Sequence, residues 1–333
     1  MALSFSYLLS SGSTGNSSAN LPIRPPRPSS STPPQTPAAA TRNAHMLKGS
    51  EFVGAGALVA PEDVAYDSKS GLIYTGCADG WVKRVTLNES AADSVVENWV
   101  FTGGRPLGLA HGHENEVFVA DAEKGLLKIS EDGTVELLTD EADGIKFKIT
   151  NGVDVAQDGM LHFTDASHKY SLKDVASDLL GGRPHGRLMS YNPTTKETKV
   201  LVHNLYFANG VAVSPDQNFV VFCETVIYDG EGQYWIALTT EVTPYWDLAL
   251  RYPFIRKVLV IVKRYAAGKP HLEKSAGVFA VNLNGEPTAH YSDPELVLIT
   301  SGIKIGNYLY CGSTVNPYII RLDVHQHPAL PTT

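Results

Sequence analysis

A repeat of about 45 residues is the feature that most limits how this chain can fold. Each unit has a short apolar segment, a turn rich in Asp, Gly, Asn or Ser, and a second apolar segment. The units read PEDVAYDSKSGLIYTGCADG from Pro61, PLGLAHGHENEVFVADAEKG from Pro106, NGVDVAQDGMLHFTDAS from Asn151 and NGVAVSPDQNFVVFCET from Asn209. Such segments indicate consecutive antiparallel strands. Repeats of this length are typical of propeller blades.

We therefore expect an all-β fold, a six-bladed β-propeller over residues 46–325. Residues 1–45 are rich in Ser and Pro and predict a disordered leader, and residues 326–333 form a tail. Because an open sheet edge is a pairing hazard, the segment EFVGAGALVA from Glu51 is expected to close the last blade onto the first. The insertion HKYSLKDVASDLLGG from His168 predicts a short helix.

The repeat is interrupted after Val226. The turn of the fourth unit lies at Pro215 and Asp216, and the next unit, IYDGEGQYWIAL, has its turn at Asp229, about 14 residues later. Where 45 or more residues are the rule, this interval predicts a missing segment of roughly 30 residues. Blades four and five are therefore expected to be truncated.

The innermost strands of a propeller line its central channel, so the first residues of equivalent repeats should meet at one axis. These residues are Glu62, Pro106 with Leu107, Asn151 and Asn209. One carboxylate and two carboxamides suit a hard cation such as Ca²⁺. Turn capping by Glu62 and ordinary Asn-Gly turns are the alternative reading. A calcium shell takes about six to eight oxygens, so a further acidic ligand is expected from the fifth blade.

Two histidines are candidates for acid–base chemistry. His162 and His185 lie near predicted blade ends and could transfer a proton if they face the channel, with a structural role as the alternative. Strand alternation places His162 and Thr164 on one face. The sequence lacks the G-x-S-x-G, H-E-x-x-H and P-loop motifs.

Composition excludes some classes of partner. A net charge of −8 and a pI near 5.8 argue against a nucleic-acid surface. Three cysteines without C-x-x-C spacing indicate buried structural thiols, with one disulfide as the alternative. Asn16 and Asn88 begin glycosylation sequons. The apolar N-terminal patch has no basic flank, so a signal peptide is not clear in the sequence.

One further segment combines apolar and basic residues. Residues 245–271 place VLVIV between Arg and Lys residues. The segment is too short to span a membrane. A helix that covers the propeller and a peripheral membrane contact are the two interpretations.

Several motifs resemble the plant strictosidine synthase-like family, whose relatives include adipocyte plasma membrane-associated protein. They include APEDVAYD, FTGGRPLGLA, KITNGVDVAQDGMLHFTDAS, LYFANGVAVSPD and SGIKIGNYLYCGS. The resemblance covers Met46 to His325. It implies a six-bladed propeller of the superfamily that holds calcium-dependent lactonases, paraoxonases and gluconolactonases, with Glu62, Asn151 and Asn209 at calcium-binding positions. It also implies the endomembrane system, in the secretory route or the vacuole.

The sequence departs from this pattern in two places. FCET meets VIYDGEG almost directly, so the Asp-Asn pair that helps hold calcium in paraoxonase-like relatives is missing. The stretch Leu298 to Tyr310 contains no Glu, His or Asp, whereas strictosidine synthase uses a Glu there to condense tryptamine with secologanin.

We therefore expect a strictosidine synthase-like protein that acts on a small-molecule substrate, as a metal-dependent hydrolase of esters or lactones. The first alternative is a non-catalytic splice or gene-model variant that acts as a binding module. The second is a strictosidine synthase-type condensation in alkaloid biosynthesis. Substrate and oligomeric state stay open.

Overall fold

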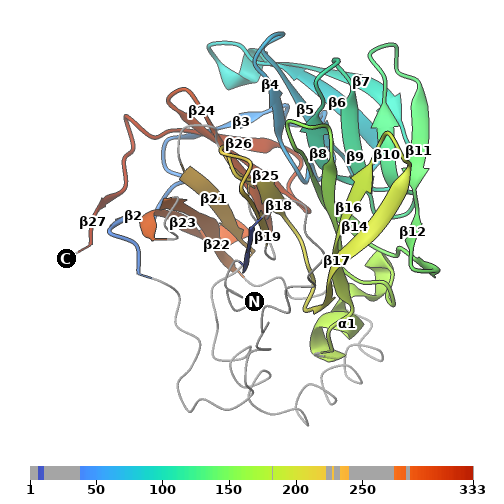
Figure 1. Ribbon diagram of the computed structural model, residues 1–333. Coiled ribbons are helices and arrows are strands. Elements are labelled where there is room, and N and C mark those ends of the chain that lie inside the picture. The colour runs from blue at the N-terminus through green and yellow to red at the C-terminus, as the bar shows by residue number, and fades with distance from the viewer. Residues whose placement is uncertain are drawn as a thin grey trace, which may run out of the picture.

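The chain folds as a β-propeller in which sheets are arranged side by side around an axis (Figure 1). The computed structural model describes residues 7–10, 38–181, 183–222, 227–228, 233–239, 274–282 and 286–332. The predicted all-β propeller is confirmed. The count of six blades stays a prediction, because parts of the fourth and fifth units lie outside the described residues.

The first three repeats each form one four-stranded antiparallel sheet, with the innermost strand first in sequence. The strands of the first sheet are β4 (Ala65–Asp67), β5 (Leu72–Gly76), β6 (Trp81–Thr86) and β7 (Val95–Phe101). Those of the second are β8 (Pro106–His111), β9 (Val117–Asp121), β10 (Gly125–Ile129) and β11 (Val135–Thr139). Those of the third are β14 (Thr150–Val155), β15 (Leu161–Asp165), β16 (Gly186–Asn192) and β17 (Glu197–Leu205).

The last sheet is completed by a strand from the start of the fold. It consists of β24 (Ile299–Ile305), β25 (Tyr308–Ser313), β26 (Ile319–Asp323) and β3 (Ser50–Val53). Strand β3 is antiparallel to β26, with Ile319 opposite Val53. The predicted closing strand is thus confirmed, and it fixes the first blade beside the last.

Two sheets contain strands from the predicted leader. The fourth repeat supplies β18 (Val211–Val213) and β19 (Phe219–Phe222), and β1 (Tyr7–Ser10) pairs with the outer edge of β19. The other sheet runs in the order β20 (Ile227–Tyr228), β21 (Gln233–Leu238), β22 (Lys274–Asn282), β23 (Pro287–Val297), β2 (Thr41–Asn43) and β27 (Leu330–Pro331). The predicted domain boundaries stay predictions, although parts of the leader take part in sheets.

Three sequence predictions lie outside the described residues or at their edge. Val226, Cys223 and segment 245–271 are not among the residues that the structure describes. The expected gap and the membrane-contact segment therefore stay predictions. No helix of the described part is long and apolar enough to cross a membrane.

The short elements lie in the connections. The hairpin β12 (Glu141–Ala142) and β13 (Ile145–Lys146) precedes β14, and the 3-10 helix η1 (Ala91–Asp93) precedes β7. The predicted helix is confirmed as the 3-10 turn η2 (Leu172–Asp174) followed by α1 (Val175–Gly181). It lies beside the ends of β14 and β17 (Figure 1).

The core consists of apolar layers between neighbouring sheets. Val82 and Tyr74 of the first sheet, for example, pack with Leu109 and Val119 of the second. Cys77 and Cys311 are buried and unpaired, as the sequence predicted. Burial raises the pKa of both thiols, so each serves as a small apolar side chain.

Candidate functional site

The innermost strands begin side by side at one end of the propeller. We call this the site end, defined by Glu62, Pro106, Asn151 and Asn209. Glycines permit the approach: a methyl group on Gly312 would lie 2.5 Å from the carbonyl oxygen of Glu62, and methyl groups on other glycines would lie equally close to the next strand. The remaining pairs are Gly76 to Pro106 O at 2.5 Å, Gly108 to Asn151 O at 2.5 Å and Gly152 to Asn209 O at 2.6 Å.

These contacts fix the order of the predicted ligands around the axis. Asn151 and Asn209 begin adjacent innermost strands, and the strand that begins at Pro106 separates Glu62 from Asn151. The structure thus brings the backbones of the three residues to the same end.

Glu62 is a buried carboxylate at the site end. Its backbone carbonyl accepts a hydrogen bond of 2.8 Å from the Thr300 hydroxyl. Burial and, to a smaller extent, the neighbouring Asp63 raise the pKa of the Glu62 carboxyl to about 8, while Arg105 opposes both effects. Within the described part of the chain, no hydrogen-bond donor to this carboxylate is recorded.

Two further carboxylates connect neighbouring innermost strands. Asp63 accepts the backbone N–H of Leu109 at 3.0 Å, and Asp154 accepts that of Val213 at 2.7 Å. Burial raises the pKa of each to about 6, and the charge of Asp63 adds to the shift at Asp154. Neither residue was predicted as a site residue from the sequence, although each lies in a recurring apolar segment, PEDV or GVDV.

Arg105 supplies positive charge beside Glu62. Its guanidinium donates to the backbone carbonyls of Ala60, Gly76 and Pro106 at 3.0, 3.3 and 3.2 Å. Burial lowers the pKa of Arg105, and the Glu62 carboxylate partly offsets this effect. The guanidinium thus ties the first two sheets together and favours the charged form of Glu62.

The two asparagines have different surroundings. Asn151 is buried, and no hydrogen bond of its side-chain amide is recorded among the described residues. The Asn209 carbonyl accepts a hydrogen bond from Thr164, whose hydroxyl in turn accepts the N–H of Gly152 at 2.9 Å. Thr164 therefore fixes the third innermost strand against the fourth.

The donor set fits a hard cation in its chemistry. A buried carboxylate without a recorded donor is costly unless a positive charge or a proton compensates it. Glu62 with the oxygens of Asn151 and Asn209 offers the neutral and anionic oxygens that Ca²⁺ prefers. In the described ranges, no cluster of three or more His, Cys, Asp and Glu side chains could hold a metal. A cation here would therefore depend on amide oxygens.

His162 lies away from the site end. It is opposite Asp154 on β14, three residues beyond Asn151, which corresponds to about 10 Å along the strand. Burial lowers the pKa of His162, so the neutral ring is favoured. Its Nδ1 atom is buried without a partner in the described part. The structure does not bring His162 together with Glu62, Asn151 and Asn209.

His185 lies at the site end, directly before β16. Its Nδ1 is 2.6 Å from Oδ1 of Asp178, which is buried in α1. The His168 ring lies edge-on at 5.7 Å and the Tyr170 ring at 5.5 Å. Leu172 and Val175 of the same insertion pack against Leu107 and Ile149. The insertion thereby holds this imidazole beside the first residues of the second and third innermost strands.

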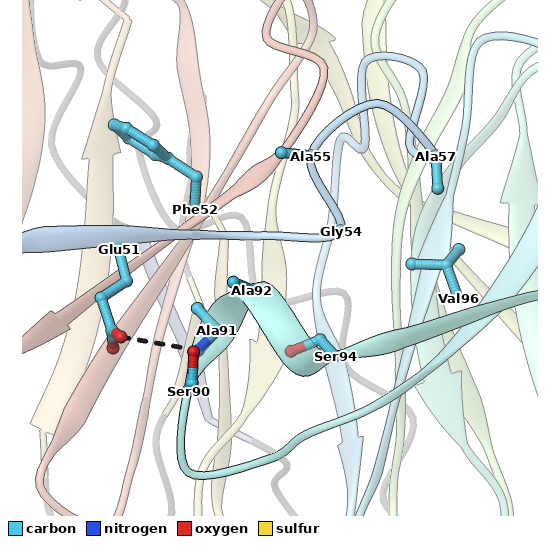
Figure 2. A pocket seen from close by; sticks show the side chains of 10 residues that line it. All are labelled: Glu51, Phe52, Gly54, Ala55, Ala57, Ser90, Ala91, Ala92, Ser94 and Val96. Atoms are coloured by element: carbon cyan, nitrogen blue, oxygen red, sulfur yellow. Dashed lines mark hydrogen bonds between the residues drawn. The ribbon is translucent and has the colours of Figure 1, made fainter.

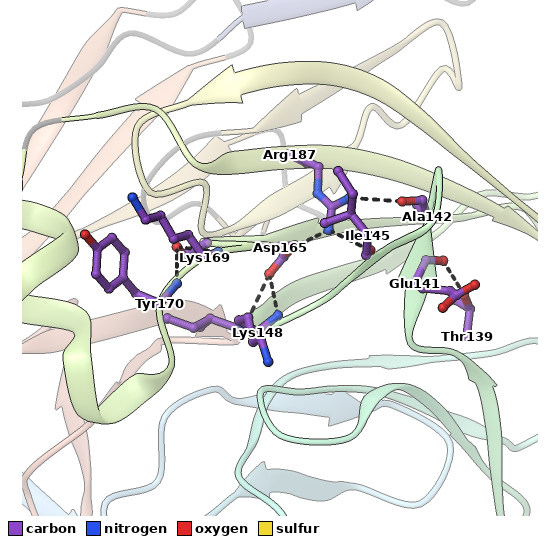
Figure 3. Close-up of polar contacts among 11 residues, drawn as sticks. Thr139, Glu141, Ala142, Ile145, Lys148, Asp165, Lys169, Tyr170 and Arg187 are labelled. Carbon is purple, nitrogen blue, oxygen red and sulfur yellow. Dashed lines mark hydrogen bonds and ion pairs between the residues drawn. The ribbon is translucent and has the colours of Figure 1, made fainter.

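A buried ion pair supports the third blade at this end. Asp165 and Arg187 are 2.8 Å apart, and Asp165 also accepts the N–H of Ile149 at 3.0 Å (Figure 3). Arg187 donates to the carbonyl of Ala142 at 3.2 Å. In the second blade, Asp121 has the position that Asp165 has in the third, at the end of the second strand, and it accepts the N–H of Arg105 at 3.0 Å. These aspartates fix the loops that lead into the innermost strands.

A shallow pocket lies elsewhere, between β3 and η1 (Figure 2). Glu51, Phe52, Ala91 and Val96 are among the residues that line it, and Ala91 N–H donates to Glu51 at 3.5 Å. It contains none of the predicted site residues.

The fold and the site end together define a β-propeller whose innermost strands begin side by side at one end, where Glu62, Asn151 and Asn209 lie. Residues 151–239 match the strictosidine synthase family, and residues 43–85 match the strictosidine synthase-like N-terminal family. The chain is 51% identical over 316 residues to strictosidine synthase-like 7 of Arabidopsis thaliana, a match that covers 86% of this chain and 85% of that protein. The chain belongs to the strictosidine synthase-like family.

The same alignment bears on the interrupted repeat. Coverage of 86% of 333 residues is about 286 residues, whereas the aligned region has 316 positions, so about 30 positions of the relative have no counterpart here. This number agrees with the predicted size of the missing segment. Its location after Val226 stays a prediction.

More distant comparisons agree with the fold. The chain is 27% identical to adipocyte plasma membrane-associated protein of Gallus gallus, over 84% of this chain and 79% of that protein. A gluconolactonase structure from Xanthomonas campestris superposes with a TM-score of 0.53 at 14% identity, covering 87% of this chain and 98% of that one. The second similarity shows the fold alone.

Proposed function

We propose that this protein hydrolyses esters or lactones of small molecules at the site end, with Ca²⁺ as cofactor. The observation that carries the proposal is the buried Glu62 carboxylate, whose pKa is raised to about 8 and which has no recorded donor within the described residues. Glu62, Asn151 and Asn209 would hold the ion. When bound, the ion supplies Lewis-acid polarisation of a carbonyl oxygen.

The chain's own groups have separate roles in this proposal. Because a carboxylate only accepts hydrogen bonds, Asp178 holds the proton on Nδ1 of His185 and leaves Nε2 of the neutral ring as an acceptor. Nε2 is then available to take a proton from an attacking water. Arg105 favours the ionised form of Glu62. Thr164 and Thr300 hold the backbone carbonyls of Asn209 and Glu62 in place by hydrogen bonds.

The gluconolactonase similarity supports a hydrolytic reaction at the level of the fold. A strictosidine synthase-type condensation has less support, because Leu298 to Tyr310 offers no Glu, His or Asp. A non-catalytic binding module is the main rival, since about 30 positions of the relatives are absent.

We also propose entry into the endomembrane system. The name of adipocyte plasma membrane-associated protein describes a relative at a membrane, and Asn88 of the sequon Asn-Glu-Ser is exposed. An endoglycosidase-sensitive mobility shift that is lost in Asn88→Gln supports this proposal, and an unshifted protein in the soluble cell fraction contradicts it.

The hydrolase proposal is tested on the purified full-length chain with p-nitrophenyl esters and aliphatic lactones, in Ca²⁺ and in a chelator. We expect turnover that requires Ca²⁺ and is lost in Glu62→Gln. A matched control is Glu97→Gln, which removes an exposed carboxylate on β7. Absence of turnover from both classes of substrate, in a folded sample that binds Ca²⁺, would favour the binding-module alternative.

A further inference from the structure

Four successive connections between blades at the site end, from the last blade round to the fourth, each carry one exposed, large apolar side chain. Val59 precedes the first innermost strand, Phe101 ends the strand before β8, Ile145 lies in the hairpin before β14, and Tyr206 precedes the fourth. Val315 is exposed in the loop after β25. The exposed fractions of these five side chains lie between 38% and 56%. We call this set the apolar collar.

Strand pairing places the collar residues at one end of the molecule. Phe101 is opposite Trp81, the first residue of β6. The Ile145 carbonyl accepts a hydrogen bond from Arg187 at the start of β16, and Tyr206 follows Leu205, which is opposite Gly186. Third strands of blades begin at the site end. The collar therefore surrounds the innermost strands at the end where Glu62 and Asn151 lie.

The opposite end has a different character. Its described hairpin turns are polar, with sequences such as DSKSG from Asp67 and GHENE from Gly112. Exposed apolar residues near that end, Val95 and Val135, begin outer strands and lie beside no innermost strand. Scattered apolar exposure is ordinary for a surface, but its recurrence in successive connections around one face indicates contact with an apolar phase.

Unpaired positive charge accompanies the collar at the third blade. Lys148, Lys169, Lys173 and Arg183 are exposed, and none has a carboxylate partner among the residues the structure describes. Ile145, Lys148 and Lys169 lie in the same neighbourhood in Figure 3. Lys169 lies over the Tyr170 ring, with Nζ 5.2 Å from its centroid. Apolar and basic side chains together match the acyl and anionic headgroup layers of a membrane surface.

We infer that the site end docks on an anionic lipid surface through the apolar collar. The five side chains stand on separate loops around a ring, so they form no single groove for a peptide. A lipid surface can accept each side chain independently. Docking would turn the innermost strands toward the membrane. This inference is independent of hydrolysis and of segment 245–271.

The inference is tested by co-sedimentation of the full-length chain with vesicles of phosphatidylcholine, with and without phosphatidylserine. We expect binding that depends on phosphatidylserine and weakens at high salt. Phe101→Ser with Ile145→Ser should reduce partitioning at least about tenfold, since each buried side chain contributes appreciably to transfer. Lys148→Gln with Lys169→Gln should weaken binding to anionic vesicles only.

Val95→Ser with Leu137→Ser is the matched control, because these residues are 59% and 53% exposed on outer strands away from the collar. It should leave partitioning unchanged. Because the Trp81 ring packs on the Phe101 ring with 5.2 Å between centroids, thermal unfolding is compared for every variant. If the Phe101→Ser, Ile145→Ser variant is unfolded, Tyr206→Ser replaces it. Absent vesicle binding, an equal loss in the control, or a collar-dependent dimer in sedimentation equilibrium would each overturn the inference.

Discussion

His185 and Asp178 are joined by a contact of 2.6 Å between Nδ1 and Oδ1, at the end of the propeller where the innermost strands begin. The carboxylate comes from α1 and the imidazole from the segment directly before β16, so the inserted helix orients a group of the blade itself.

This pair predicts that orientation, as well as the presence of the ring, matters for activity. Asp178→Asn should retain the fold but lower kcat by about 10²-fold or more, because the orienting carboxylate is lost. His185→Gln should lower kcat at least as much, because the group that accepts the proton is lost. Steady-state kinetics of both variants with an ester substrate check this, alongside thermal unfolding of each. A kcat equal to that of the wild type in folded His185→Gln contradicts the assignment.

The buried ion pair of Asp165 with Arg187 predicts a large stability loss when one partner is removed. Arg187→Ala leaves an uncompensated buried carboxylate and should lower the free energy of unfolding by about 3–5 kcal/mol. Arg84→Ala breaks the more exposed pair with Glu97 and should cost about 1 kcal/mol or less. Urea denaturation of the two variants makes the comparison, and equal losses would contradict it.

The close approach of innermost strands predicts that Gly108 cannot be enlarged without cost. In Gly108→Ala, the new methyl group would lie 2.5 Å from the backbone carbonyl oxygen of Asn151. This distance is too short, so the backbone of one of the two strands must move. A loss of about 1–3 kcal/mol is expected. Gly181→Ala is the control, since a methyl group there meets nothing within 4 Å. Thermal unfolding of both variants tests the spacing, and a neutral Gly108→Ala contradicts it.

The raised pKa of Glu62 predicts how stability of the metal-free protein depends on pH. The folded pKa of about 8 exceeds the ordinary value of 4.5, so the folded state binds the proton more tightly. This contribution is fully present below about pH 4.5 and is lost as pH rises through about 8.

In chelator, Glu62→Gln should therefore be more stable than the wild type at pH 8, by a few kcal/mol. Near pH 4 the two proteins should be equally stable. Denaturant unfolding at the two pH values measures this difference. The opposite trend would show that the carboxylate is already compensated within the metal-free protein.

The propeller could be predicted because turns and apolar segments recur at a fixed spacing. The same register identified Glu62, Asn151 and Asn209 as first residues of innermost strands, and the structure places their backbones at one end. Asp178 could not be found in this way, because it lies in an insertion outside the repeat. Asp63 and Asp154 were missed because a single carboxylate in an apolar strand gives no sign of the backbone N–H that it accepts.

His162 shows the limit of reading a strand by alternation. Alternation predicted the face of the strand on which His162 lies. Its distance from the site end follows from the pairing of His162 with Asp154, which depends on the bulge between Thr150 and Val153. Pairing of β1 with β19 was equally inaccessible, since it joins residues more than 200 positions apart.

An ion site where the innermost strands meet is tested by calorimetric titration of Ca²⁺ into the metal-free full-length chain. We expect one bound Ca²⁺ per chain, with affinity that increases from pH 6 to pH 8 as Glu62 ionises, and loss of binding in Glu62→Gln but not in Glu97→Gln. Binding that is absent at pH 8, or unaffected by Glu62→Gln, would contradict an ion site at the meeting point of the innermost strands.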